Sequence, residues 1–350
     1  MVSGEKTTVA LVLAGGIGSR LYPASRGDRP KQFLPIGGDR SLLARTVDRA
    51  GFADEVIVAT RPRFADEIGE HAPDADVLIE PHGKDTGPAL TYATHQIREQ
   101  YGDDKTENSD DPVVLTLPSD HYVGDDAAFR ETMAAGAHVA RETGRLVTFG
   151  VTPERPETGY GYIEPGTERE STGEAFHEVA RFHEKPDAET AREYVDAGYR
   201  WNSGMFAWTP SAFLDAAADS PLGPLVEALD AGDPETGFAA VDPVSVDYAV
   251  LERAANVAVV DADFAWDDLG SWDALDRVLA PDDDGNVAIG DHLTVDATDN
   301  VVVSDDKHVS LVGVSGLAVV AYDDRVLVVP KEDAQRVREL VALLEEDGSF

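Results

Sequence analysis

Residues 13–21 read Leu-Ala-Gly-Gly-Ile-Gly-Ser-Arg-Leu, and residues 30–35 continue the pattern with Pro-Lys-Gln-Phe-Leu-Pro. The first stretch follows Thr8–Leu13, a short apolar run of the length and composition typical of a buried parallel strand. The glycines therefore fall where this strand is expected to end. Open α/β sheets bind their ligands at that edge.

The residue types of this loop indicate a phosphate-binding site. Glycines let backbone N–H groups approach a phosphate closely, and Arg20 and Lys31 add two cations. The spacing excludes two common nucleotide loops. A dinucleotide fingerprint would need glycine where Leu21 stands, and a P-loop needs a Gly-Lys-Ser/Thr sequence that is absent.

The rest of the chain to about residue 280 predicts an α/β domain. Apolar runs at 55–59, 77–79, 113–117 and 146–150 alternate with helical patterns at 41–50, 63–71 and 127–143, and with a helix that follows the segment 80–90 and ends at about residue 100. This alternation predicts a Rossmann-like, mostly parallel mixed sheet with helices on both faces. The acidic, turn-forming segment 281–285 predicts a domain boundary, with one domain at 1–280 and a small β-rich domain at 285–350. The second domain is expected to end in a helix at 332–344.

The composition is strongly acidic. There are 67 Asp and Glu against 29 Lys and Arg, for a formal net charge of −38, and the acidic residues are spread along the chain. Such a surface repels nucleic acid and anionic membranes, so neither is an expected partner. The pattern is typical of proteins from salt-accumulating halophiles. With no cysteine and no signal-like or membrane-length apolar run, we expect a cytoplasmic protein without disulfides.

Two further segments carry polar residues at expected strand ends. Residues 80–90 form a turn-rich segment that leads into a helix, and Pro-Ser-Asp-His at 118–121 follows the strand at 113–117. A carboxylate beside a triphosphate needs a cation between them, so Asp120 is a predicted Mg²⁺ ligand. The acidic segment 103–111 is expected to be a solvated loop.

Seven motifs in order along the chain resemble those of the sugar-1-phosphate nucleotidyltransferases, and the Lys-Gln-Phe-Leu ending is similar to the mannose-1-phosphate guanylyltransferase branch. Three are the glycine loop with its continuation to residue 35, the segment 80–90 and Pro-Ser-Asp-His at 118–121. The other four are Thr-Gly-Tyr-Gly-Tyr-Ile at 158–163, Phe-His-Glu-Lys-Pro at 182–186, Trp-Asn-Ser-Gly-Met-Phe at 201–206 and Trp-Asp-Asp-Leu-Gly-Ser-Trp at 266–272. An eighth, Ser-Val-Asp-Tyr-Ala-Val-Leu-Glu at 245–252, resembles a pattern of the guanylyltransferase branch and contains Asp247. The resemblance covers about residues 8 to 345. It implies a C-terminal appendage like a left-handed β-helix, and a short form without the isomerase domain of longer relatives.

The resemblance also implies a role for each motif residue. Lys84 and Gly87 stand where the branch commonly has arginine and alanine. It implies that Arg20, Lys31 and Lys185 are catalytic. It also implies that Asp120 and Asp268 bind Mg²⁺, with Asp267 as a polar neighbour. The nucleotide would be bound by Leu13, Gly15, Gly16, Gly18, Ser19, Lys84, Thr86 and Gly87, and the sugar phosphate by Gly161, Glu184, Lys185, Asn202 and Asp247.

The implied reaction is GTP plus α-D-mannose 1-phosphate giving GDP-mannose and pyrophosphate, by in-line attack on the α-phosphorus, in a homodimer. Two alternatives stay open: a nucleotidyltransferase for another sugar phosphate or nucleotide, and a non-catalytic regulatory paralogue. An NAD-dependent oxidoreductase would need the fingerprint that Leu21 breaks.

Overall fold

The computed structural model describes residues 7–102, 111–348 and 350, so all but the last residue of the predicted loop at 103–111 lies outside it. Contacts divide the chain into two compact units. The first unit comprises the chain up to Gly15, Thr46–Pro118 and Asp125–Phe264, and the second comprises Gly16–Arg45, Ser119–Gly124 and Ala265–Phe350. The predicted domain boundary near residue 281 stays a prediction.

The first unit is built on one nine-stranded sheet with the order β3-β2-β1-β4-β9-β6-β10-β8-β7. Strands β1 to β4 pair in parallel, whereas β9 runs antiparallel to both β4 and β6. The Rossmann-like mixed sheet is therefore confirmed. Its strands are β1 Thr8–Leu13, β2 Glu55–Thr60, β3 Asp76–Ile79, β4 Val113–Pro118, β6 Leu146–Val151, β7 Tyr162–Ser171, β8 Glu174–His183, β9 Arg200–Trp208 and β10 Val257–Ala262.

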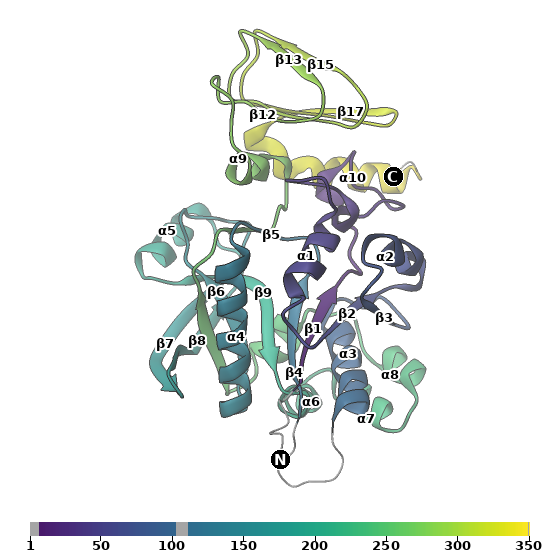
Figure 1. Ribbon diagram of the computed structural model, residues 1–350, viewed down its shortest axis with the longest axis vertical. Coiled ribbons are helices and arrows are strands. Elements are labelled where there is room, and N and C mark those ends of the chain that lie inside the picture. Colours follow the sequence, from purple (N-terminus) through teal and green to yellow (C-terminus); the bar gives the residue numbers. More distant parts are fainter. Residues whose placement is uncertain (1–6, 103–110, 349) are drawn as a thin grey trace. The chain divides into compact units, whose positions relative to one another are not determined.

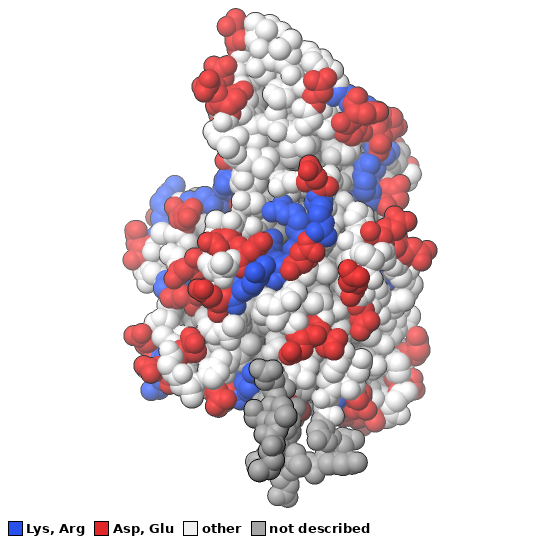
Figure 2. Space-filling view, viewed as in Figure 1, with Lys and Arg blue, Asp and Glu red and all other residues white. Residues whose placement is uncertain are grey.

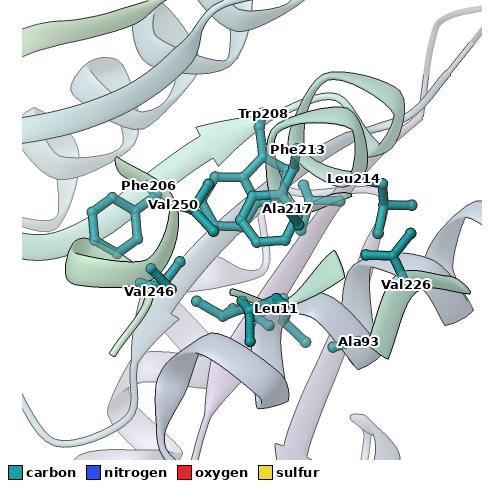
Figure 3. Packing of buried hydrophobic residues seen from close by; sticks show 14 of the residues in the cluster. Leu11, Ala93, Phe206, Trp208, Phe213, Leu214, Ala217, Val226, Val246 and Val250 are labelled. Atoms are coloured by element: carbon teal, nitrogen blue, oxygen red, sulfur yellow. The ribbon is translucent and has the colours of Figure 1, made fainter. Parts of the chain in front are cut away.

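Helices cover this sheet because their apolar residues bury against it. Helix α4 packs on β4, β6, β9 and β10 (Figure 1). A separate core contains residues of α3, α6 and α7 around Trp208, which stacks on Phe213 at 4.2 Å between ring centroids (Figure 3). The helices here are α2 Ala65–His71, α3 Thr86–Tyr101, α4 Asp126–Thr143, α5 Ala188–Asp196, α6 Pro210–Ala218, α7 Gly223–Asp230 and α8 Pro234–Ala240, with α1 Leu42–Ala50 at the boundary of the units.

The second unit contains the C-terminal β-strands. Strands β12, β14 and β16 are parallel, β17 pairs antiparallel with β16, and β13 pairs in parallel with β15, which confirms the expected β-helix-like appendage. Its elements are β5 Tyr122–Val123, β11 Trp266–Asp267, β12 Val287–Ile289, β13 His292–Val295, β14 Val301–Ser304, β15 Val309–Val312, β16 Leu317–Tyr322, β17 Arg325–Pro330, α9 Leu275–Val278 and α10 Val337–Glu346. Short 3-10 helices η1 Ser19–Leu21, η2 Lys31–Phe33, η5 Trp272–Ala274 and η6 Lys331–Arg336 complete it.

Helix starts follow the expected capping chemistry. The Asp187 carboxylate accepts hydrogen bonds from the backbone N–H groups of Glu189 and Thr190, and Asp125 does the same for the first turn of α4. Ser41 Oγ accepts from the N–H of Ala44 at the start of α1. None of the helices in the described ranges is both long and apolar enough to cross a membrane.

The acidic side chains are dispersed over the visible surface (Figure 2). With a formal charge of −38, their mutual repulsion opposes folding at low salt. At 1 M salt the screening length is only about 3 Å, so we expect the melting temperature to rise steadily from 0.1 M to molar KCl. Calorimetry at several KCl concentrations measures this, and an unchanged melting temperature would rule out a halophilic requirement.

Candidate functional site

The glycine loop begins where β1 is tied to β2. The N–H of Ala14 donates to the carbonyl of Ala59 at 2.8 Å, and Thr60 Oγ1 donates to the carbonyl of Ala14 at 2.9 Å. Gly15 follows, and a Cβ there would lie 3.2 Å from Glu80 Oε1. Glu80 is paired with Arg61 at 3.4 Å, so this ion pair supports the loop backbone from one side.

Gly18 lies where the glycine loop at 13–21 meets its continuation at 30–35. Its φ of 68° is left-handed, and a Cβ would lie 2.5 Å from Lys31 Cβ, so only glycine fits on both counts. The N–H of Lys31 donates to the carbonyl of Ile17 at 2.9 Å, and Gln32 Nε2 donates to that of Gly16 at 3.1 Å. Gly16 itself has open space where a Cβ would stand, which leaves its backbone accessible to a ligand.

Lys31 connects the segments that carry the two predicted metal ligands. Its side chain is only 5% exposed, and Nζ lies 2.8 Å from Asp120 Oδ2 and also donates to the backbone carbonyl of Asp268. Burial favours a raised pKa for Asp120, but the Lys31 ammonium and the His121 ring outweigh it and hold that pKa below its usual range. Asp120 is therefore an ionised carboxylate near neutral pH, and it stays about one-third exposed.

The neighbouring carboxylates Asp267 and Asp268 have different environments. Asp267 is buried, pairs with Arg277 at 2.6 and 3.2 Å, and accepts from the N–H of Leu269. Asp268 is partly exposed, accepts from the N–H of Gly270 and lies 3.9 Å from Arg20 Nη2. The geometry thus favours Asp268 over Asp267 as a ligand for an incoming group.

Asp120 and Asp268 fit the chemistry of a Mg²⁺ site. Both are partly exposed carboxylates of the second unit, and Mg²⁺ commonly takes one or two carboxylates plus substrate phosphates and water. Across the described residues, no set of three or more His, Asp or Glu side chains is placed to hold a metal by itself.

The second predicted nucleotide loop is anchored within the first unit. The Lys84 ammonium donates to the carbonyl oxygens of Phe238 and Val241 at 2.7 and 2.8 Å, and Thr86 Oγ1 accepts from the N–H of Val246 at 3.0 Å. These contacts give Lys84 a structural function, and its nucleotide-binding role stays a prediction. Asp85 has φ 73° and ψ −179°, a region that costs a non-glycine residue about 1–3 kcal/mol.

Gly87 is expected to tolerate no larger residue. Its N–H donates to the carbonyl of Val244 at 2.9 Å, and a Cβ would lie 2.6 Å from that oxygen. We therefore expect Gly87→Ala to destabilise the protein by about 1–3 kcal/mol, as measured by urea unfolding. The matched control is Gly69→Ala in α2, where a Cβ meets open space. This substitution should stabilise the folded protein by about 0.5–1 kcal/mol. Equal stability of the two variants would contradict the contact.

The predicted sugar-phosphate residues gather at one place in the first unit. Asn202 Nδ2 donates to Asp247 Oδ1 at 2.7 Å, and the N–H of Asn202 donates to the carbonyl of Gly161 at 2.9 Å. A Cβ on Gly161 would lie 3.3 Å from the carbonyl oxygen of His183, the residue before Glu184. Strand β7 pairs with both β8 and β9, and it therefore brings together the motifs at 158–163, 182–186 and 201–206.

Acidic neighbours shape this cluster. Burial raises the pKa of Asp247, with Glu184 and Asp85 adding repulsion and the Asn202 hydrogen bond opposing it. Asp247 lies in the π-helix η4 (Asp247–Leu251), a rare element that often occurs at functional sites. Lys185 is exposed, and the described part of the chain offers its ammonium neither a hydrogen bond nor an ion pair.

The predicted residues thus divide between the units. Arg20, Lys31, Asp120 and Asp268 interact within the second unit, with Ser19 beside Arg20 in η1, and the acceptor residues lie within the first. Sequence reasoning missed the Arg61–Glu80 pair, although both residues directly follow strands, the signal used for Asp120. It also missed Gln335, whose amide oxygen accepts a hydrogen bond from Arg20. No sequence pattern near residue 335 indicates a functional role.

Comparisons with known proteins identify the family of the chain. The nucleotidyl transferase family model matches residues 9–284, and the model of the MannoseP isomerase/GMP-like β-helix domain matches residues 290–344. The xanthan biosynthesis protein XanB of Xanthomonas campestris pv. campestris is 37% identical over 97% of this chain and 73% of its own length. The mannose-1-phosphate guanylyltransferase of Escherichia coli K12 has the same identity and coverage.

A solved structure extends the comparison to three dimensions. The protein of Thermus thermophilus described as a mannose-1-phosphate geranyltransferase is 38% identical, with a TM-score of 0.87 over 97% of this chain and all of its own. The resemblance seen in the sequence is confirmed over nearly the whole chain. This chain therefore belongs to the nucleotidyl transferase family, with a GMP-like β-helix domain, and is a nucleotidyltransferase.

Proposed function

We propose that this protein transfers a guanylyl group from GTP to α-D-mannose 1-phosphate and releases pyrophosphate. The observation that carries the proposal is the contact set around Lys31, which links the glycine loop to both predicted metal ligands. Relatives named mannose-1-phosphate guanylyltransferase support the choice of substrates.

The reaction needs no protein nucleophile. An oxygen of the sugar phosphate is already ionised and attacks the α-phosphorus, the new P–O bond forms, and the bond to the β-phosphate breaks to release pyrophosphate. The protein contributes position and charge. We assign Arg20 and Lys31 to the triphosphate, Lys185 to the sugar phosphate, and Asn202 and Glu184 to sugar hydroxyls.

We further propose Asp120 and Asp268 as ligands of Mg²⁺, which when bound would neutralise phosphate charge. Lys31 would keep Asp120 ionised, and the Gly270 N–H would orient Asp268. Chelation with EDTA should abolish turnover, and Asp268→Asn should raise the Mg²⁺ concentration for half-maximal activity about tenfold or more. Full activity in EDTA would exclude the metal.

Pyrophosphate release over a panel of nucleoside triphosphates and sugar 1-phosphates tests the substrates, in molar KCl with Mg²⁺. The expected result is preference for GTP with mannose 1-phosphate. Preference for another pair would identify a related nucleotidyltransferase. Release with no pair would favour the non-catalytic paralogue.

We also propose that two copies pair through the β-helix. The paired strands β13 and β15 expose the apolar side chains Leu293, Val295 and Val312, and β17, in another sheet, exposes Val326 and Val328. On a chain of charge −38, the apolar side chains of β13 and β15 offer a place where two copies can approach with less repulsion. Light scattering should give a dimer for the wild type and a monomer for Val312→Asp, and a monomeric wild type would refute it.

A further inference from the structure

Arg20 is held by a residue of the C-terminal segment. Its Nη1 donates to Gln335 Oε1 at 3.1 Å, across 315 positions of sequence. On its other side, Arg20 Nη2 lies 3.9 Å from Asp268 Oδ2. Gly270 leaves room for this arrangement, since a Cβ there would lie 3.0 Å from Nη2 and 2.9 Å from the Asp268 carboxylate.

The orientation of the Gln335 amide follows from its partners. Arg20 can only donate, so the amide oxygen must face it, and Gln335 Nε2 then donates to Ser271 Oγ at 2.9 Å. Ser271 in turn donates to Asp273, which pairs with Arg277 at 2.9 Å. One glutamine thus connects the signature loop to the Trp-Asp-Asp-Leu-Gly-Ser-Trp segment.

The backbone beneath Arg20 also packs on the C-terminal helix. Leu21 belongs to the same buried cluster as Leu269, Val337 and Val341, and η1 contacts α10 directly. Trp272 Nε1 donates to the carbonyl of Tyr22 at 2.9 Å in this core. The C-terminal segment therefore supports both the backbone and the side chain of Arg20.

We propose that Gln335 is a positioning residue for Arg20, through which the C-terminal domain sets the affinity for the nucleoside triphosphate. The inference rests on the proposed function for the role of Arg20. A guanidinium fixed by a neutral amide oxygen keeps its full charge for phosphate. A fixed guanidinium also loses less conformational freedom when the triphosphate binds.

Replacing Gln335 tests this without disturbing the core, because its side chain is exposed. Gln335→Ala should raise the KM for GTP about tenfold and leave the KM for mannose 1-phosphate and the melting temperature unchanged. Gln335→Glu would place a carboxylate beside Arg20 and should weaken the binding of GTP further. The matched control is Arg336→Gln, which makes the same charge change at the next, exposed position and should leave both KM values unchanged.

A double-mutant cycle separates positioning from a merely structural effect. In an Arg20→Ala background, Gln335→Ala should change the affinity for nucleotide by less than about twofold. An equal loss in both backgrounds would overturn the inference. Titration calorimetry with GTP, ATP, CTP and UTP measures nucleotide affinity without turnover, so the two proposals can fail separately. A lack of product formation would refute the proposed reaction. An unchanged nucleotide affinity in Gln335→Ala would refute the role of Gln335.

Discussion

Lys31→Met is expected to lower kcat/KM by about 10²–10³-fold and to reduce stability as well. The activity loss is the usual cost of removing one preorganised donor. The stability loss arises because the buried Lys31 ammonium donates to Asp120 and to the Asp268 carbonyl, and both contacts would be lost. Losing such buried polar contacts costs about 1–3 kcal/mol.

The control for Lys31 is a partly buried lysine of the second unit, Lys331, whose side chain is 15% exposed. Lys331 Nζ lies 2.6 Å from Asp276 Oδ2 and 2.5 Å from Asp299 Oδ1, away from the predicted site residues in sequence. Lys331→Met should lose comparable stability and keep wild-type kcat/KM at a temperature where both variants are folded. Steady-state kinetics with thermal melting makes the comparison, and wild-type turnover in Lys31→Met would refute the assignment.

Lys185→Ala should lose much of its activity but none of its stability, which is the opposite of the result expected for Lys331→Met. The exposed Lys185 ammonium has no partner among the described residues, so its removal breaks no contact there. If it pairs with the sugar phosphate, kcat/KM for mannose 1-phosphate should fall about 10²–10³-fold, with KM for GTP nearly unchanged.

Arg181→Ala is the matched variant for Lys185, since it removes one exposed cation four positions earlier on β8. It should leave both substrates' kinetic constants within about twofold, as surface charges generally contribute little. Equal losses in the two variants would mean that Lys185 acts only through the general charge of this surface.

The sequence predicted local structure well where one physical signal dominates. The short apolar runs at 55–59 and 113–117 became β2 and β4, and the run before the glycines became β1, because a strand pattern depends on neighbouring residues. Strand β10, Val257–Ala262, was not predicted, although it contains a short apolar run of the same kind and shortly precedes the motif at 266–272. The antiparallel insertion of β9 between β4 and β6 depends on distant partners, which local patterns cannot show.

The same distinction applies to the site. Arg20, Lys31 and Asp268 were chosen by motif, and the structure places them in contact. The environment of Lys84 could not be predicted, because its partners Phe238 and Val241 lie 154 and 157 positions away. Arg277 is only ten positions from Asp267, but the burial of Asp267 depends on tertiary packing, which no local pattern shows. Gln335 was invisible for the same reason, because its partners lie 64 and 315 positions away.

The discontinuity of the second unit has a consequence for how the protein is made. The ribosome makes residues 16–45 before residues 265–350, at about 5–20 residues per second, so roughly tens of seconds separate the two segments. During that interval the loop at 13–21 lacks the partners that pack on Leu21 and bind Arg20. Nascent chains arrested before residue 265 should therefore bind GTP poorly, and chains that include residues 265–350 should bind it.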